Sequence, residues 1–146
     1  MRELALGLLA RREHSRKELC AKLKLRGIEG ELADAVLEQL SAERLQSDQR
    51  FAETYLHSRV QKGYGPVRLE QELYERGIEA QLIQSSLEGL DTNWMDILQS
   101  VRQKKFGRTL PAGFNEQAKE SRFLQYRGFT TDQIRHLYKN KKTDDE

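Results

Sequence analysis

The sequence predicts an all-α protein of three tandem three-helix repeats, about nine helices that form an elongated, curved modular array. One observation behind this prediction is an internal repeat with a spacing of 50 residues, with a glycine at the same place in each copy. The other is the scarcity of helix breakers, because the 146 residues include only two prolines. Self-similarity at such a period is typical of stacked helical units that bury a shared core.

The repeat is clearest when residues 15–40 are laid over residues 65–90, since ten of these 26 positions are identical without a gap. A weaker third copy follows 51 residues later, with matching residues at Leu124, Arg127, Gly128, Phe129, Ile134, Leu137 and Tyr138. We therefore predict repeats over residues 1–46, 47–90 and 91–140, with a Gly/Pro loop insertion at 107–115 and a frayed, charged tail at 141–146.

Local start signals predict where the helices begin. Ser15 and Glu18 form a capping box, in which each side chain accepts a hydrogen bond from the other residue's backbone N–H. Gly65 and Pro66 stand at the same place in the second copy, as a tolerated N-cap and a favoured first helical residue. Each copy also has a leading helix, expected over residues 2–12, over 48–62 after a Ser47 cap, and over 93–106 after an Asp91 or Thr92 cap.

The repeated glycines predict three identical helix ends. Gly27, Gly77 and Gly128 each fall where a helix closes through a left-handed residue. In such a Schellman motif the next residue folds back on the helix, which pairs Ile28 with Leu23, Ile78 with Leu73, and Phe129 with Leu124. A further helix follows in each copy, with apolar residues Leu32, Val36, Leu37 and Leu40, then Leu82, Ile83 and Leu87, then Ile134, Leu137 and Tyr138.

Charge is distributed unevenly along the chain. Residues 1–26 hold eight Lys/Arg against three Asp/Glu, a balance of +5, whereas residues 27–46 hold one base against five acids, a balance of −4. A helix-turn-helix in the first copy would insert this acidic helix between DNA phosphates, so we do not expect major-groove reading by it. The bases on the other helices suit either solvated faces or a stripe for a polyanion, and composition leaves both open.

No constellation of catalytic or metal-binding residues is present in the sequence. His14, His57 and His136 show no metal-ligand spacing with one another or with Cys20. The counterpart of Cys20 in the second copy is Glu70, which indicates a helix flank and not a nucleophile. We expect no enzyme activity, no cofactor and no metal, and, because no apolar run could span a bilayer and no signal peptide is present, a cytoplasmic protein.

Three stretches of the chain resemble the RecX family. They are LLARREHSRKELCAKLKLRG, LQSDQRFAETYLHSRVQKGYGPVRLEQELYERGI and ESRFLQYRGFTTDQI, and together they cover nearly the whole sequence. The resemblance implies tandem three-helix units and a negative regulator of RecA. Such a protein binds in the groove of the RecA–DNA filament and limits filament growth, ATP hydrolysis, strand exchange and co-protease activity in the SOS response.

The contact surface for RecA or DNA is a hypothesis drawn from the basic residues at the central turn. We expect it to comprise Arg59, Lys62, Tyr64 and Arg68, extended by Arg11, Arg12 and Arg122. Arg26, Arg76 and Arg127 are expected to be structural, at helix C-termini. The expected partner is the RecA filament and the expected state is a monomer. The alternative function is a DNA-binding protein that affects recombination by competing for single- or double-stranded DNA.

Overall fold

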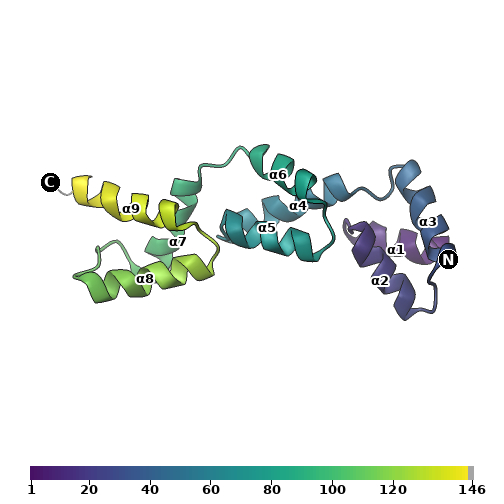
Figure 1. The fold of residues 1–146 in the computed structure, drawn as a ribbon, viewed down its shortest axis with the longest axis horizontal. Coiled ribbons are helices and arrows are strands. Elements are labelled where there is room, and N and C mark those ends of the chain that lie inside the picture. The colour runs from purple at the N-terminus through teal and green to yellow at the C-terminus, as the bar shows by residue number, and fades with distance from the viewer. Residues whose placement is uncertain (145–146) are drawn as a thin grey trace. The chain divides into compact units, whose positions relative to one another are not determined.

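The structure, a computed structural model, describes the backbone of residues 1–144 and consists over that range of nine α-helices without a strand (Figure 1). The helices are α1 (Arg2–Arg11), α2 (Arg16–Leu25), α3 (Glu31–Ala42), α4 (Asp48–Gln61), α5 (Pro66–Glu75), α6 (Ala80–Glu88), α7 (Trp94–Phe106), α8 (Phe114–Tyr126) and α9 (Thr131–Asp144). The predicted all-α fold of three-helix repeats is confirmed, whereas the curvature and extension of the array stay predictions. No helix in the described range is long and apolar enough to cross a membrane.

Residue contacts divide the chain into two compact units. Unit 1 consists of Met1–Leu56 and Glu72–Glu88, and unit 2 consists of His57–Gln71 and Gly89–Glu146. Helices α4 and α5 therefore contribute residues to both units.

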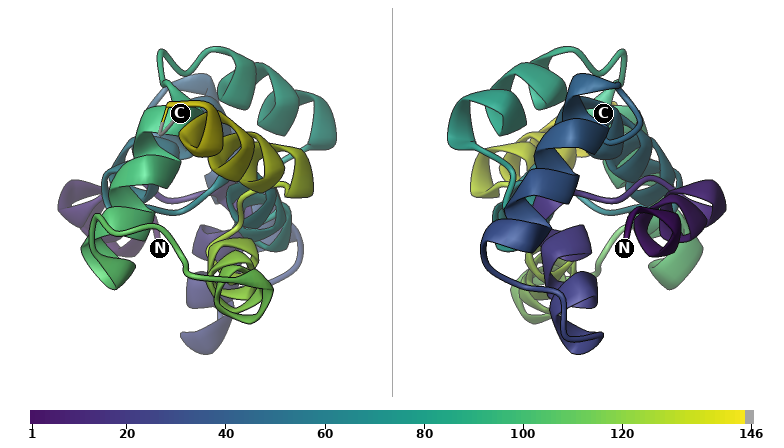
Figure 2. Two further views of the ribbon diagram at one scale, coloured as in Figure 1. Left: turned by 90° about the vertical axis from the view of Figure 1, so that its left-hand side faces the viewer. Right: turned by 90° about the vertical axis from the view of Figure 1, so that its right-hand side faces the viewer.

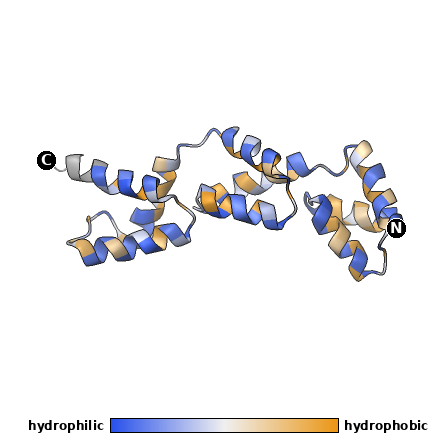
Figure 3. Ribbon diagram, in the orientation of Figure 1, coloured by the Kyte–Doolittle hydropathy of each residue, from blue (hydrophilic) through white to orange (hydrophobic). Residues whose placement is uncertain are grey.

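One hydrophobic core of unit 1 lies among α1, α2 and α3. Its buried residues are Ala5, Leu19, Leu23, Ala33, Leu37 and Leu40. A fully buried leucine contributes about 1.5–3 kcal/mol relative to an exposed one, so these side chains hold the three helices together. Leu32, which was expected among the apolar residues of this helix, does not pack in this core. It is 60% exposed, whereas the neighbouring Ala33 is buried. Figure 3 shows hydrophobic and hydrophilic residues interleaved along each helix, as amphipathic helices require.

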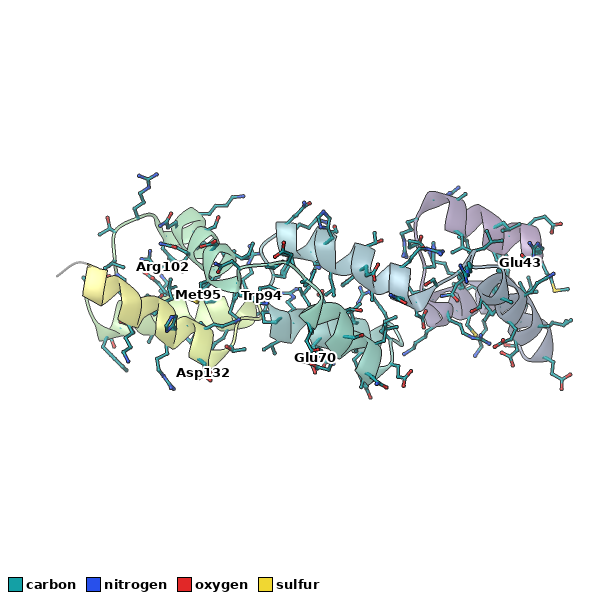
Figure 4. All side chains as sticks on the ribbon, turned by 90° about the horizontal axis from the view of Figure 1, so that it is seen from above. Glu43, Glu70, Trp94, Met95, Arg102 and Asp132 are labelled. Carbon is teal, nitrogen blue, oxygen red and sulfur yellow. The ribbon has the colours of Figure 1, made fainter. Side chains whose placement is uncertain are left out.

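One hydrophobic core of unit 2 lies among α7, α8 and α9, which contact one another pairwise (Figure 2). Its buried residues are Leu98, Leu124, Phe129, Ile134, Leu137 and Tyr138. Trp94 and Met95, at the start of α7, pack against this core (Figure 4).

The three predicted Schellman motifs are confirmed. Gly27, Gly77 and Gly128 have φ values of 79°, 82° and 102°, in the left-handed region that favours glycine. The residue after each glycine donates its N–H back to the helix, from Ile28 to Leu23 O at 3.0 Å, from Ile78 to Leu73 O at 3.1 Å, and from Phe129 to Leu124 O at 3.2 Å. Each hydrogen bond satisfies a carbonyl that the helix end leaves without an intrahelical partner.

Most of the predicted helix starts are confirmed as well. The Ser15 and Glu18 capping box forms in full, and the Ser47 hydroxyl accepts from the Arg50 N–H at 3.1 Å. The expected cap of α7 is wrong, because Asn93 takes that position and accepts from the N–H groups of Met95 and Asp96. Asn93 directly follows the two expected caps, and its side-chain oxygen accepts these hydrogen bonds as an Asp carboxylate or a Thr hydroxyl would.

Several helix boundaries differ from the expected ones by one or two residues. Helices α1 and α4 each end one residue early, at Arg11 and Gln61. The loop between α7 and α8 spans 107–113 and not 107–115, because Phe114 begins α8. Helix α9 continues to Asp144 and so includes the first part of the predicted frayed tail, while residues 145–146 lie outside the described range.

A contact between consecutive repeats occurs in unit 1, and we call it joint 1. The start of α2 meets the glycine turn that ends α5. The Ser15 hydroxyl donates to Arg76 O at 2.8 Å, and Lys17 Nζ donates to Glu75 O at 3.1 Å. A Cβ on Gly77 would lie 2.7 Å from Lys17 Cβ, so only glycine fits this approach.

The same contact recurs in unit 2 with other residues, and we call it joint 2. The start of α5 meets the glycine turn that ends α8. Gly65 N–H donates to Arg127 O at 2.8 Å, and Val67 N–H donates to Gly128 O at 2.9 Å. A Cβ on Gly128 would lie 2.3 Å from Arg68 Cβ, closer than any real contact. The 50-residue period therefore reproduces the docking of one repeat on the next as well as the repeat itself.

A candidate interaction surface around Tyr64

Tyr64 is positioned by a fourth glycine turn, at the end of α4. Gly63 has a φ of 88°, and the Tyr64 N–H donates to Arg59 O at 3.3 Å. A Cβ on Gly63 would lie 2.7 Å from Val101 Cγ2, so glycine lets the end of α4 approach α7 closely. The turn leaves the half-buried Tyr64 ring between α4 and α5 of unit 2.

Three guanidinium groups surround the Tyr64 ring. The Cζ atoms of Arg59, Arg68 and Arg127 lie 3.9, 4.5 and 4.9 Å from its centroid. Each cation–π contact at such a site contributes about 0.5–1 kcal/mol, because the ring face carries negative charge density. Arg68 also lies 5.2 Å from the exposed Tyr126 ring. We call Arg59, Lys62, Tyr64, Arg68 and Arg127 the Tyr64 cluster.

Arg127 links the Tyr64 cluster to the end of α4. Its Nη1 donates to Lys62 O at 3.3 Å, so the guanidinium satisfies a carbonyl beyond the last turn of that helix. Arg76, its counterpart in the second repeat, donates to Glu72 O at 3.0 Å and lies 4.7 Å from the Tyr55 ring. Arg26 is exposed. The structural role expected for these arginines is thus visible for Arg76 and Arg127.

A pocket of about 220 Å³ adjoins the Tyr64 cluster in unit 2, and we call it the cationic pocket. It is lined by Lys62, Val101, Lys104, Lys105, Phe123 and Arg127. Lys105 Nζ lies 5.5 Å and Arg127 Cζ 5.4 Å from the Phe123 centroid. The Phe106 ring packs against Phe123 at 89°, with centroids 5.4 Å apart. Four cations and two apolar side chains therefore share one concavity.

The predicted contact residues fall into both units. Arg59, Lys62, Tyr64 and Arg68 lie together in unit 2, as the central-turn hypothesis requires, and Arg122 is exposed on α8 of the same unit.

Arg11 and Arg12 belong to unit 1, where Arg11 is exposed at the end of α1. Arg12 forms a two-pronged ion pair with Glu18, at 3.1 and 3.3 Å, and donates to Glu13 O at 2.8 Å. These hydrogen bonds already engage the Arg12 guanidinium within its own unit.

Sequence reasoning missed a buried polar network in unit 2. Arg102 on α7 (Figure 4) is fully buried, and its Nε donates to Glu120 Oε1 at 2.7 Å. The same guanidinium donates to the carbonyls of Gly107 and Thr109, which fixes the loop before α8. The Tyr138 hydroxyl donates to Glu120 at 2.8 Å, and burial, together with the Glu120 carboxylate, strongly raises the pKa of Tyr138. Nothing in the spacing of these residues signals the network, because α7, α8 and α9 each supply one member.

The three histidines and the cysteine do not belong to the Tyr64 cluster. His57, His136 and Cys20 are exposed. His14 is buried, with Nδ1 3.0 Å from Arg12 O and Nε2 2.9 Å from Lys22 Nζ. Burial lowers the pKa of His14, and the neighbouring cations act in the same direction. Over the described residues, no group of three or more His, Cys, Asp or Glu side chains gathers where it could hold a metal ion.

Comparison with known proteins shows three matches to family models, in chain order. They are the first, second and third three-helix domains of RecX, and they match residues 2–40, 47–87 and 91–137. The chain belongs to the RecX family.

Relatives and solved structures agree with this assignment. Regulatory protein RecX of Halorhodospira halophila is 44% identical over 100% of this chain and 91% of its own length. Regulatory protein RecX of Pseudomonas syringae pv. tomato is 41% identical over 99% of this chain and 94% of its own length. The crystal structure of RecX from Lactobacillus salivarius superposes with a TM-score of 0.80 at 20% identity, covering 95% of this chain and 92% of that one. The RecX fold is therefore present across the chain.

Proposed function

We propose that this protein is a negative regulator of RecA that binds in the groove of the RecA–DNA filament. Bound there, it limits filament growth, ATP hydrolysis, strand exchange and co-protease activity, and so acts in recombination, repair and the SOS response within the cytoplasm. Occupying a groove and bridging subunits needs no catalytic group, since a ligand that binds one state of an assembly shifts its equilibrium by mass action. The observation that carries the proposal is the match of all three RecX domains, in order.

The Tyr64 cluster is the part of the surface that we assign to this contact. Arginine and tyrosine are the side chains enriched at the energetic centres of interfaces, because each combines apolar area with hydrogen-bonding groups. Here the guanidinium groups are already ordered by the Tyr64 ring at 3.9–4.9 Å. Binding therefore immobilises fewer free rotamers than it would at an unordered basic patch.

The first experiment measures single-stranded-DNA-dependent ATP hydrolysis by preformed RecA filaments, with this protein added well below the RecA concentration. Inhibition at such a low ratio is expected, because a groove binder or filament cap acts on many subunits at once. If inhibition required enough protein to cover the DNA sites, and vanished at moderate salt, the DNA-competition alternative would replace the proposal. Phosphate contacts weaken steeply with salt, whereas a protein contact with apolar area weakens less.

Charge reversal tests the assigned surface. The double variant Arg59→Glu/Lys62→Glu should lose most of the inhibition, because two cations of the Tyr64 cluster become anions that repel an acidic contact. The matched control is Lys24→Glu/Arg26→Glu, which changes the charge equally on exposed residues of unit 1. Normal inhibition by the first variant, with unchanged far-UV circular dichroism, would refute the central-turn assignment.

A further inference from the structure

The cationic pocket holds more positive charge than its surroundings neutralise. Its lining includes Lys62, Lys104, Lys105 and Arg127 but no acidic side chain. Within the described part of the chain, none of these four cations forms an ion pair with an Asp or Glu. Some arginines elsewhere do have an acidic partner, as Arg12 has Glu18, Arg50 has Glu13 and Arg102 has Glu120.

Helix ends explain how these cations can gather without an acid. Lys104 and Lys105 lie in the last turn of α7, Lys62 follows the last residue of α4, and Arg127 is the C-cap of α8. A helix C-terminus is equivalent to about half a negative charge, so three of them offset about one to two of the four positive charges. A net positive charge therefore faces the pocket. This positive charge has no negative counterpart unless an anion binds, so the arrangement favours an anionic ligand.

The wall of the pocket points to a ligand with apolar as well as anionic groups. Val101 and Phe123 line it together with the cations. The Arg127 guanidinium is held by its hydrogen bond to Lys62 O and by contacts with two rings. A fixed guanidinium presents a planar pair of N–H donors that matches a carboxylate.

A nucleic-acid strand fits this pocket less well than a peptide. A strand repeats its phosphates along a line, whereas these cations converge on one concavity of about 220 Å³. Single-stranded nucleic acids also gain affinity by stacking bases on aromatic faces. Here the ring of Phe123 already carries two cations and meets the Phe106 ring edge to face, so base stacking would compete with those contacts.

We propose that the cationic pocket binds a short acidic peptide segment of a partner protein, with Asp or Glu carboxylates beside an apolar side chain. The carboxylates lie among Lys62, Lys104, Lys105 and Arg127, and the apolar side chain lies against Val101 and Phe123. This inference rests on the proposed function, because it names the chemistry that the regulator's surface recognises on its partner. To the contact surface expected from the sequence it adds Val101, Lys104, Lys105 and Phe123, together with Arg127, which was expected to be structural.

The test is direct binding measured by fluorescence anisotropy, without RecA. The probes are a fluorescein-labelled Asp-Glu-Phe-Glu-Asp peptide, its neutral counterpart Asn-Gln-Phe-Gln-Asn, and a labelled oligothymidine. The binding variant is Lys104→Gln/Lys105→Gln. Its matched control is Arg108→Gln/Arg135→Gln, which removes two charges from exposed residues of the same unit that do not line the pocket.

We expect the acidic peptide to bind more tightly than the neutral one. The Lys104/Lys105 variant should weaken that binding roughly tenfold and the control should leave it unchanged, because each lost ion pair at a partly exposed site contributes several-fold in affinity. Equal binding of the two peptides would overturn the inference. If the Lys104/Lys105 variant lost affinity for oligothymidine but not for the acidic peptide, that result would also overturn the inference and would make the pocket a nucleic-acid site.

The outcomes also separate this inference from the proposed function. If RecA inhibition were observed but the acidic peptide did not bind, the pocket inference alone would fail. If the peptide bound as expected but RecA hydrolysis were unaffected, the proposed function would fail and the chemistry of the pocket would stand.

Discussion

Replacing glycine by alanine in the three Schellman motifs should destabilise the protein to very different degrees. The backbone conformation is nearly the same at the three sites, with φ between 79° and 102°. What differs is the space that a Cβ would enter. At Gly27 it would meet nothing within 4 Å, whereas at Gly77 and Gly128 it would meet the neighbouring repeat.

The magnitudes follow from two separate costs. A left-handed conformation costs a residue with a Cβ about 1–2 kcal/mol, which is the whole effect expected for Gly27→Ala. Gly128→Ala adds a clash, because the new Cβ would lie 2.3 Å from Arg68 Cβ and 2.8 Å from Arg68 N. Inserting a methyl group into a tightly packed site costs about 1–3 kcal/mol more, so the total is about 2–5 kcal/mol. Gly77→Ala should fall between them, since its Cβ would lie 2.7 Å from Lys17 Cβ, a longer approach than the 2.3 Å at Gly128.

Urea unfolding measures these costs. Far-UV circular dichroism follows all helices, and the fluorescence of Trp94, the sole tryptophan, follows unit 2. If the two units unfold separately, each variant is compared with the wild-type transition of its own unit. Equal losses of unfolding free energy for Gly27→Ala and Gly128→Ala would refute the reasoning. The whole loss would then come from the left-handed backbone of the glycine turn, and the clash at joint 2 would contribute nothing.

Three further perturbations have expected outcomes in the same unfolding assay. Glu120→Gln should cost about 3–5 kcal/mol, because it leaves the buried Arg102 guanidinium without its counter-charge, and a loss below 1 kcal/mol would contradict a buried ion pair there. Ser15→Ala should cost about 1–2 kcal/mol through the lost cap and the lost hydrogen bond to Arg76 O, and an unchanged free energy of unfolding would contradict both roles of the hydroxyl. The pKa of His14 is lower in the folded protein than in the unfolded one, so the unfolded state binds more protons as the pH falls below about 6.5. The free energy of unfolding should therefore decrease from pH 8 to pH 5.5. The variant His14→Gln should make that decrease smaller.

Local signals in the sequence were sufficient for the helices and their ends. The Ser15 capping box and the three glycine turns depend on residues a few positions apart, and all of them form as expected. The error at α7 is of the same local kind, because Asp91, Thr92 and Asn93 are neighbouring residues that can each cap a helix. Leu32 shows the limit of pattern reasoning. It is identical to its counterpart in the second repeat, yet the packing of α3 buries Ala33 instead.

Tertiary contacts were beyond the reach of sequence spacing. The hydrogen bond from Arg102 to Glu120 joins residues 18 positions apart, and its partners look like ordinary surface charges in the sequence. The Tyr64 cluster was found only in part, because Arg59, Lys62 and Arg68 lie near the turn in the sequence, while Arg127 comes from the next repeat. Lys104 and Lys105 reach the cationic pocket through the packing of α7, which no periodicity in the chain reveals.

The two joints have a consequence for how such a chain can lengthen. The second repeat carries both halves of the contact, the helix start at Gly65 and the glycine turn at Gly77. A tandem duplication of the gene segment for this repeat would therefore copy the helix start together with the glycine turn. The new repeat could dock on its neighbours at once, before any substitution adapted the surfaces to each other. Descent by duplication thus needs no separate origin for the interfaces, and later divergence, as from the Ser15 hydroxyl to the Gly65 amide, can change the donor while keeping the carbonyl that it meets.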